Sequence, residues 1–187
     1  MALVCRGPYP GRKVIQPTPS RYTFLFNIAI PIPSPFMNTP LIALDLTKQA
    51  PHSPRSRNGG FALANRAADK CRSTLAGTQG EYHYNCPLDN QLFTFKGIDG
   101  AQFQAAVQGA KTYEDLGIWL QTHGTTKTSA EIKAWSDEIE ASSPMKNPER
   151  RDQFINNCGH LGLNPQTNST FDWLEADDRA SFARKAI

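Results

Sequence analysis

The stretch FALANRAADKCRSTLAG, residues 61–77, points most directly to the fold class. Its small apolar side chains recur at the spacing of one helical face, at Ala64, Ala67, Ala68, Cys71 and Leu75. Polar side chains line another face, at Arg66, Asp69, Lys70 and Ser73. Glycine is common directly after a helix, and Gly77 is well placed to end this one. The spacing therefore predicts an amphipathic helix.

Further segments after Ile98 carry the same kind of signal. Asp99, Thr112, Thr128 and Asn147 each stand where a side chain would cap the start of a helix. Apolar residues at helical spacing follow these caps, among them Phe103 and Val107, Leu116 and Leu120, Ile132 and Ile139, and Phe154 and Cys158. Residues 170–187 form a last amphipathic segment. Several short helices with brief connections are expected.

Residues 80–97, GEYHYNCPLDNQLFTFKG, have a different pattern. Aromatic residues alternate at Tyr82 and Tyr84 and again at Phe93 and Phe95, and Pro87 suits the second position of a turn. Alternation is typical of β-strands, so we predict a short hairpin here. The expected fold class is mostly α, a compact bundle of about five or six short helices with one small β-hairpin.

Composition changes at Met37. Residues 1–36 contain four basic side chains, no acidic one, and seven of the fourteen prolines, so the basic surplus of the chain lies in this leader. A surplus outside the folded body gives no argument for nucleic-acid binding. Three interpretations stay open: a secretory signal, a disordered tail, and upstream sequence read in frame before a start at Met37. We expect residues 1–36 to be disordered or mis-assigned, and residues 37–187 to form a single helical domain.

The remaining composition is that of a globular protein, with 39% hydrophobic and 20% charged residues. There is no run of eighteen apolar residues, so neither a membrane-spanning helix nor a membrane partner is expected. After the leader there are three widely spaced cysteines, Cys71, Cys86 and Cys158. An odd, scattered set predicts free thiols and a cytoplasmic location.

Three segments taken in order carry a family resemblance. SPRSRNGG, then NRAADKCR, then GEYHYNCPLD followed by LFTFKGID resemble the bacterial domain-of-unknown-function family 5069. The likeness runs from Leu44 to Ala180 and is densest between Ser53 and Asp99. The resemblance implies a small stand-alone bacterial domain. It supplies no catalytic assignment, so the candidate site is argued from the residues themselves.

One candidate site is for an anion. Arg55 and Arg57 precede Asn58, Gly59 and Gly60, directly before the first predicted helix. Glycine lets the backbone approach a ligand closely, and a helix N-terminus favours negative charge. A phosphate or carboxylate would fit there. The alternative is a plain turn with two solvated arginines.

A second candidate centres on Cys86. It could act as a nucleophile with His83 or His160 as its base, the alternative being an unreactive buried cysteine. Together with Cys158 these side chains are also the types that hold zinc. Their spacing lacks the common C-x-x-C pair, and Cys158 falls on an apolar helical face, so we expect no metal.

We combine these segments into one expected ligand site, composed of Arg55, Arg57, Gly59, Gly60, Glu81, His83, Cys86 and Asp89. The expected function is a pocket for a small anionic ligand, with or without enzymatic activity, where the hairpin meets the entry to the first helix. The alternative is a non-catalytic protein-interaction or regulatory module that uses exposed tyrosines and tryptophans. No cofactor and no nucleic acid are expected, and the sequence names no protein partner.

Overall fold

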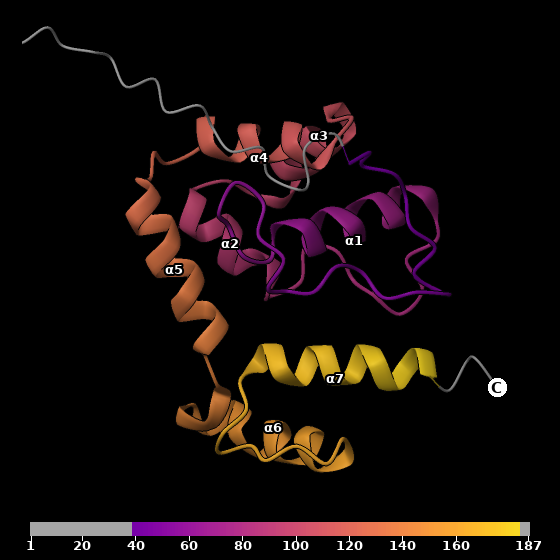
Figure 1. Ribbon diagram of the computed structural model, residues 1–187, viewed down its shortest axis with the longest axis vertical. Helices are drawn as coiled ribbons and strands as arrows, with labels where there is room; N and C mark the ends of the chain where they lie inside the picture. Colours follow the sequence, from indigo (N-terminus) through magenta and orange to yellow (C-terminus); the bar gives the residue numbers. More distant parts are fainter. Residues whose placement is uncertain (1–38, 184–187) are drawn as a thin grey trace, which may run out of the picture. The chain divides into compact units, whose positions relative to one another are not determined.

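The computed structural model describes residues 39–183, and the structural statements below concern these residues. The predictions for the leader, residues 1–36, lie outside this range. Within it the chain forms seven α-helices, one short 3₁₀ helix and no β-sheet. The helices, shown in Figure 1, are α1 (Ala64–Ala76), α2 (Asp89–Lys96), α3 (Gly100–Gly109), α4 (Tyr113–Thr122), α5 (Ser129–Ala141), η1 (Pro144–Lys146), α6 (Pro148–His160) and α7 (Thr170–Ala183). The prediction of a mostly α-helical fold is confirmed.

The predicted β-hairpin is wrong. The segment before Asp89 is a series of turns, and the segment after it is helix α2. The buried side chains of α2 are Asp89, Leu92, Phe93 and Lys96, which follow the spacing i, i+3, i+4, i+7. The alternation of Phe93 and Phe95 concealed this helical pattern. Residues 80–88 are held by side-chain hydrogen bonds in place of a strand ladder, for example from the Tyr84 hydroxyl to the carbonyl of Gly100 at 2.6 Å.

Side-chain caps determine where four of the helices begin, as the sequence predicted. The side chains of Asp99, Thr112 and Thr128 each accept a hydrogen bond from the third backbone amide of their helix, and the side chain at that third position bonds back. Asn147 caps α6, with Pro148 in the first helical position. These caps separate the chain after Ile98 into short helices.

Helix α1 is buried on both of its faces from Ala64 to Cys71, while Leu75, predicted on the apolar face, is 44% exposed in the last turn. Ala64, Ala67 and Ala68 are fully buried, as expected for the apolar face. The polar face is buried as well, because Arg66 and Lys70 are each only 4% exposed. Burying a charge costs free energy unless it is paired, so this face needs partners from elsewhere in the chain.

The main apolar core forms around α1, and α3 packs against this helix. Its largest members include Phe61, Phe93, Phe103, Leu116 and Leu120, all 1% exposed or less. Small side chains on α1 leave room for these rings, which contact one another; for example, the ring centroids of Phe93 and Phe103 lie 5.0 Å apart. A second, smaller cluster around Phe171 joins α5 and α7 to the segment before α1.

Arg55 connects the segment before α1 to two distant helices. Its guanidinium donates hydrogen bonds to Asp172 and Glu175 on α7, both at 2.7 Å, and to Glu140 on α5 at 3.0 Å. It also lies 5.8 Å from the centroid of the Phe171 ring. Three carboxylates around one arginine hold α5 and α7 against the same segment, and so fix the position of α7. None of the helices in residues 39–183 is long and apolar enough to cross a membrane.

Candidate functional site

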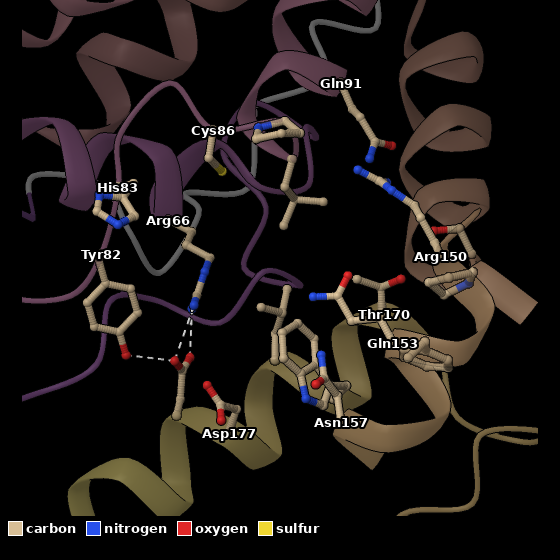
Figure 2. A pocket seen from close by; sticks show the side chains of 18 of the residues that line it. Arg66, Tyr82, His83, Cys86, Gln91, Arg150, Gln153, Asn157, Thr170 and Asp177 are labelled. Carbon is tan, nitrogen blue, oxygen red and sulfur yellow. Dashed lines mark hydrogen bonds and ion pairs between the residues drawn. The ribbon is translucent and has the colours of Figure 1, made fainter. Parts of the chain in front are cut away.

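A cavity of about 760 Å³ lies between α1, the turns of residues 80–88, α6 and α7. We call it the α6–α7 cavity. Figure 2 shows side chains from all four of these parts around it. Its volume is in the range of small-molecule sites in proteins, which are concave and lined by apolar walls with a few polar groups.

The apolar walls of the cavity come from three parts of the chain. Leu88 precedes α2, Phe154 lies on α6, and Trp173 and Leu174 lie on α7. Phe154 is buried at 4% exposure, while the two α7 side chains are half-buried and so retain surface to offer. An aromatic or aliphatic body would bury apolar area against these side chains.

One wall holds a buried ion pair. Arg66 on α1 donates two hydrogen bonds to the carboxylate of Asp178 on α7, at 2.7 and 3.2 Å, and the Tyr82 hydroxyl donates a third at 2.7 Å (Figure 2). Burial, together with this carboxylate, raises the pKa of Tyr82, so its hydroxyl stays protonated and donates. This group joins α1 to α7 and closes that side of the cavity.

A second buried pair stands behind Cys86. The ammonium of Lys70 lies 2.7 Å from Oδ1 of Asp89 and 3.3 Å from Sγ of Cys86. The other carboxylate oxygen of Asp89 accepts from the backbone N–H of Cys86 at 3.3 Å. Lys70 and Asp89 have side chains only 5% and 1% exposed, whereas Cys86 is half-buried and lines the cavity.

A polar stripe on α6 faces the cavity. Arg150, Gln153 and Asn157 follow the spacing i, i+3, i+7 and all line it. Figure 2 shows the side chains of Gln91 and Arg150 pointing toward one another from α2 and α6. Arg66 and Lys70 are paired with carboxylates, but Arg150 forms no ion pair with any residue in the range 39–183. Arg150 is therefore the positive group on the wall that is available to a ligand.

The structure brings three of the predicted site residues to this cavity. Glu81, His83 and Cys86 line it, all from the turns of residues 80–88. Asp89 lies behind the wall and is occupied by Lys70. The predicted binding role of these four residues has not been tested and stays a prediction.

The other predicted site residues lie outside the cavity wall. Arg57 donates to Asp137 at 2.7 Å and to Glu140 at 3.1 Å, so both predicted arginines are engaged with carboxylates. Gly59 and Gly60 have positive φ angles of 57° and 90°. A Cβ at Gly59 would lie 3.0 Å from the carbonyl oxygen of Gly117 on α4. Gly59 therefore packs tightly on α4, whereas a Cβ at Gly60 would lie 3.1 Å from Cγ2 of Ile132 on α5. A ligand role for these two glycines stays a prediction.

The described residues contain no group of three or more His, Cys, Asp or Glu side chains arranged to hold a metal ion. His83 and Cys86 are therefore not joined by Cys158 and His160 in one cluster. Cys158 lies in the apolar interior at 0% exposure, and burial raises the pKa of its thiol. This is the buried core cysteine that its helical position indicated.

Sequence reasoning missed several residues of the cavity, above all Lys70, Arg150 and Trp173. A signal was present for α6, because Arg150, Gln153, Phe154 and Asn157 recur at helical spacing. That spacing shows that they share a face, but not what the face looks onto. For Lys70 the sequence showed only a polar helical face, which is usually solvated.

Comparison with known proteins supports one assignment. A family model described as a domain of unknown function (DUF5069) matches residues 48–180. The search of curated proteins found no match. The matched range contains α1, the turns of residues 80–88 and α6, and it includes most of α7. The resemblance seen in the three sequence segments is therefore confirmed.

Proposed function

The chain belongs to the DUF5069 family, and on that premise we propose that it is a small-molecule-binding domain that takes an anionic ligand in the α6–α7 cavity. The proposal rests on Arg150. This cation lies on the wall of a ligand-sized cavity, and its guanidinium forms no ion pair with a carboxylate among residues 39–183. A guanidinium binds carboxylates and phosphates through paired hydrogen bonds.

The remaining wall supports a ligand of two parts. The amides of Gln91 and Gln153 lie beside Arg150 and would bond the polar part of a ligand. Phe154 and Trp173 would contact an apolar or aromatic part. The ligand class we propose is therefore a small aromatic or aliphatic compound with one carboxylate, sulfonate or phosphate.

Anilinonaphthalene sulfonate has this chemistry and becomes fluorescent in apolar sites, so it serves as the probe. We expect it to bind the full chain, and Arg150→Gln to weaken binding about tenfold, because a hydrogen-bonded charge pair is lost. Arg151→Gln is the matched control: Arg151 is the next residue on α6, half-exposed and away from the cavity wall. Equal affinities of the two variants would refute the anion site.

A second measurement locates the probe. Trp173 lies on the cavity wall, while Trp119 lies on the distant surface of α3 and α4. Energy transfer from tryptophan to the bound probe should fall more in Trp173→Phe than in Trp119→Phe. The opposite order would place the probe elsewhere and overturn the proposal.

We argue the binding function ahead of the interaction module because of where the aromatic residues lie. Among the described residues, Trp119, Trp135 and Trp173 are all partly buried. Trp135 stacks on Phe95 with ring centroids 4.6 Å apart. This partial burial of the tryptophans favours the binding function over an interaction surface formed by exposed aromatic side chains.

We place the protein in the cytoplasm on its cysteine pattern, since Cys71, Cys86 and Cys158 are all free thiols. Catalysis in the cavity would require a reactive group in its wall.

A further inference from the structure

We propose that Cys86 is the reactive thiol of the α6–α7 cavity and that it exchanges with small acidic disulfides. The inference rests on the proposed anion binding, because the acidic part of the disulfide would be held by Arg150. It adds a covalent step and a ligand class to a site so far argued only to bind.

The first support is the position of Lys70. Its ammonium lies 3.3 Å from Sγ of Cys86, and its side chain is 95% buried, so the charge is held in place beside the sulfur. A sulfur that attacks an electrophile carries negative charge, and an adjacent ammonium stabilises that charge. Asp89 keeps the geometry fixed, because one oxygen binds Lys70 and the other accepts from the Cys86 backbone.

The second support is access. Cys86 lines a cavity of about 760 Å³, which is large enough for a ligand to reach the sulfur. The other two described thiols lie in the interior, with Cys71 at 1% and Cys158 at 0% exposure. Burial raises the pKa of Cys71 to about 11 and also raises that of Cys158, so neither is ready to attack. Reactivity among these three thiols should therefore be confined to Cys86.

The same geometry identifies Lys70 as the side chain that acts on the sulfur of Cys86. Sequence reasoning considered His83 or His160 as a base. His83 is exposed and makes no hydrogen bond to any described residue, whereas Lys70 contacts the sulfur directly. Lys70 is thus the group that acts on Cys86, through charge stabilisation.

The chemical step is a simple exchange. The Cys86 sulfur attacks one sulfur of the disulfide, a new S–S bond forms, and the original S–S bond breaks. The departing thiolate takes the electron pair of that bond, and the proton of Cys86 passes to water. Cys86 is oxidised to a mixed disulfide while half of the ligand is reduced, so no further oxidant is needed.

The test compares two aromatic disulfides on the full chain. Dithiobis(nitrobenzoic acid) carries carboxylates, and dithiodipyridine is neutral; peptide mass spectrometry assigns each adduct to its cysteine. We expect Cys86 to react with the acidic reagent about tenfold faster than a small unstructured thiol does, since a hydrogen-bonded positive charge stabilises the attacking sulfur. A rate equal to or below that of the free thiol would overturn the inference.

A charge-neutral variant tests the role of Lys70. Lys70→Met alone would leave Asp89 buried without a partner, so Lys70→Met is combined with Asp89→Asn, and circular dichroism confirms folding. The double variant should lose about tenfold in the rate at Cys86 with both reagents. An unchanged rate would show that Lys70 does not act on the sulfur. If the double variant does not fold, the comparison with the free thiol still decides.

Arg150→Gln separates this inference from the proposed function. If both hold, this variant slows the acidic reagent and leaves the neutral one unchanged. Fast reaction of Cys86 with the neutral reagent, together with dye binding that ignores Arg150, would refute the anion site and keep the reactive thiol. Slow reaction of Cys86 together with Arg150-dependent dye binding would refute the reactive thiol alone.

Discussion

From Ala64 to Cys71 the two faces of α1 are both buried, but they are buried by different chemistry. The face with Ala64, Ala67 and Cys71 packs against the aromatic core and needs only shape and apolar area. The face with Arg66 and Lys70 is buried because Arg66 pairs with Asp178 on α7 and Lys70 pairs with Asp89 at the start of α2.

The difference separates the face of α1 that stabilises the fold from the face that positions the site. The apolar face stabilises the fold because it removes apolar area from water. Such a face tolerates substitutions of similar volume. The charged face contributes little net free energy, because desolvation offsets much of the attraction within each pair. Its effect is positional, since Arg66 and Lys70 fix the walls of the α6–α7 cavity. We therefore expect the two faces to respond differently to single and double substitutions.

The largest effect should come from the apolar side. Phe103 is fully buried and contacts the rings of Phe93 and Tyr84. Phe103→Ala removes a ring and leaves a cavity, which should lower the free energy of unfolding by about 4 kcal/mol in urea denaturation. The control is Ile118→Ala, since Ile118 is 51% exposed. A cost below about 1 kcal/mol for Phe103→Ala would mean that α1 does not depend on this core.

The charged side should show a cost that depends on which partners are removed. Arg66→Met leaves the Asp178 carboxylate largely buried without its arginine, so we expect a loss of about 3 kcal/mol in the free energy of unfolding. Asp178→Asn in the same chain removes the unpaired charge and keeps an acceptor for the Tyr82 hydroxyl.

The double variant should therefore recover most of that loss and end within about 1 kcal/mol of the parent. The measurement is a double-mutant cycle in urea. Additive losses from the two substitutions would show that the pair is not coupled, and the contrast between the two faces of α1 would then fail.

The sequence predicted the apolar face of α1 and its core, but not the burial and pairing of the charged face. Capping residues such as Asp99 and Thr128, and apolar spacing as at Phe103 and Val107, are local signals, and the helices they mark were found. Helix α2 was missed because Phe93 and Phe95 also fit a strand, and only packing against α1 and α3 decides between the two.

The candidate site shows the same limit of local patterns. Glu81, His83 and Cys86 are close in sequence and line one cavity, and their binding role stays a prediction. The partners of Arg55 on α7 are more than one hundred residues away, and no local pattern shows that carboxylates occupy it. Pairing between distant charges depends on the tertiary fold, which a periodicity does not encode.

A smaller effect should come from His52, which meets the charged side of α1 at Asp69. Nδ1 of His52 lies 2.7 Å from a carboxylate oxygen of Asp69, and this hydrogen bond raises the pKa of His52. The charged imidazole is thus favoured by folding, so its contribution is complete below the unfolded pKa of about 6.5 and is lost as pH rises through the higher folded pKa.

The substitution His52→Asn keeps a donor to Asp69 and removes the titration. Its cost should be largest near pH 5.5 and shrink toward pH 9, with each unit of pKa shift corresponding to about 1.4 kcal/mol. Urea denaturation across this range measures the difference from the parent chain. A cost that grows with pH would show that the charged imidazole of His52 does not stabilise the fold.

The smallest effect is expected at Gly109, which lies on α3 and so outside both faces of α1. Gly109 ends α3, and a Cβ there would meet nothing within 4 Å, so Gly109→Ala should raise the free energy of unfolding by about 0.5–1 kcal/mol through lower chain entropy. Gly117→Ala is the matched control on α4, where a Cβ would collide with the buried side chain of Asn58. That variant should lose stability, because Asn58 is also held by its hydrogen bond to the carbonyl of Tyr113 at 2.7 Å. The midpoints of thermal unfolding of the two variants should therefore shift in opposite directions. A shift in the same direction would show that Asn58 packs on α4 less tightly than its contacts indicate.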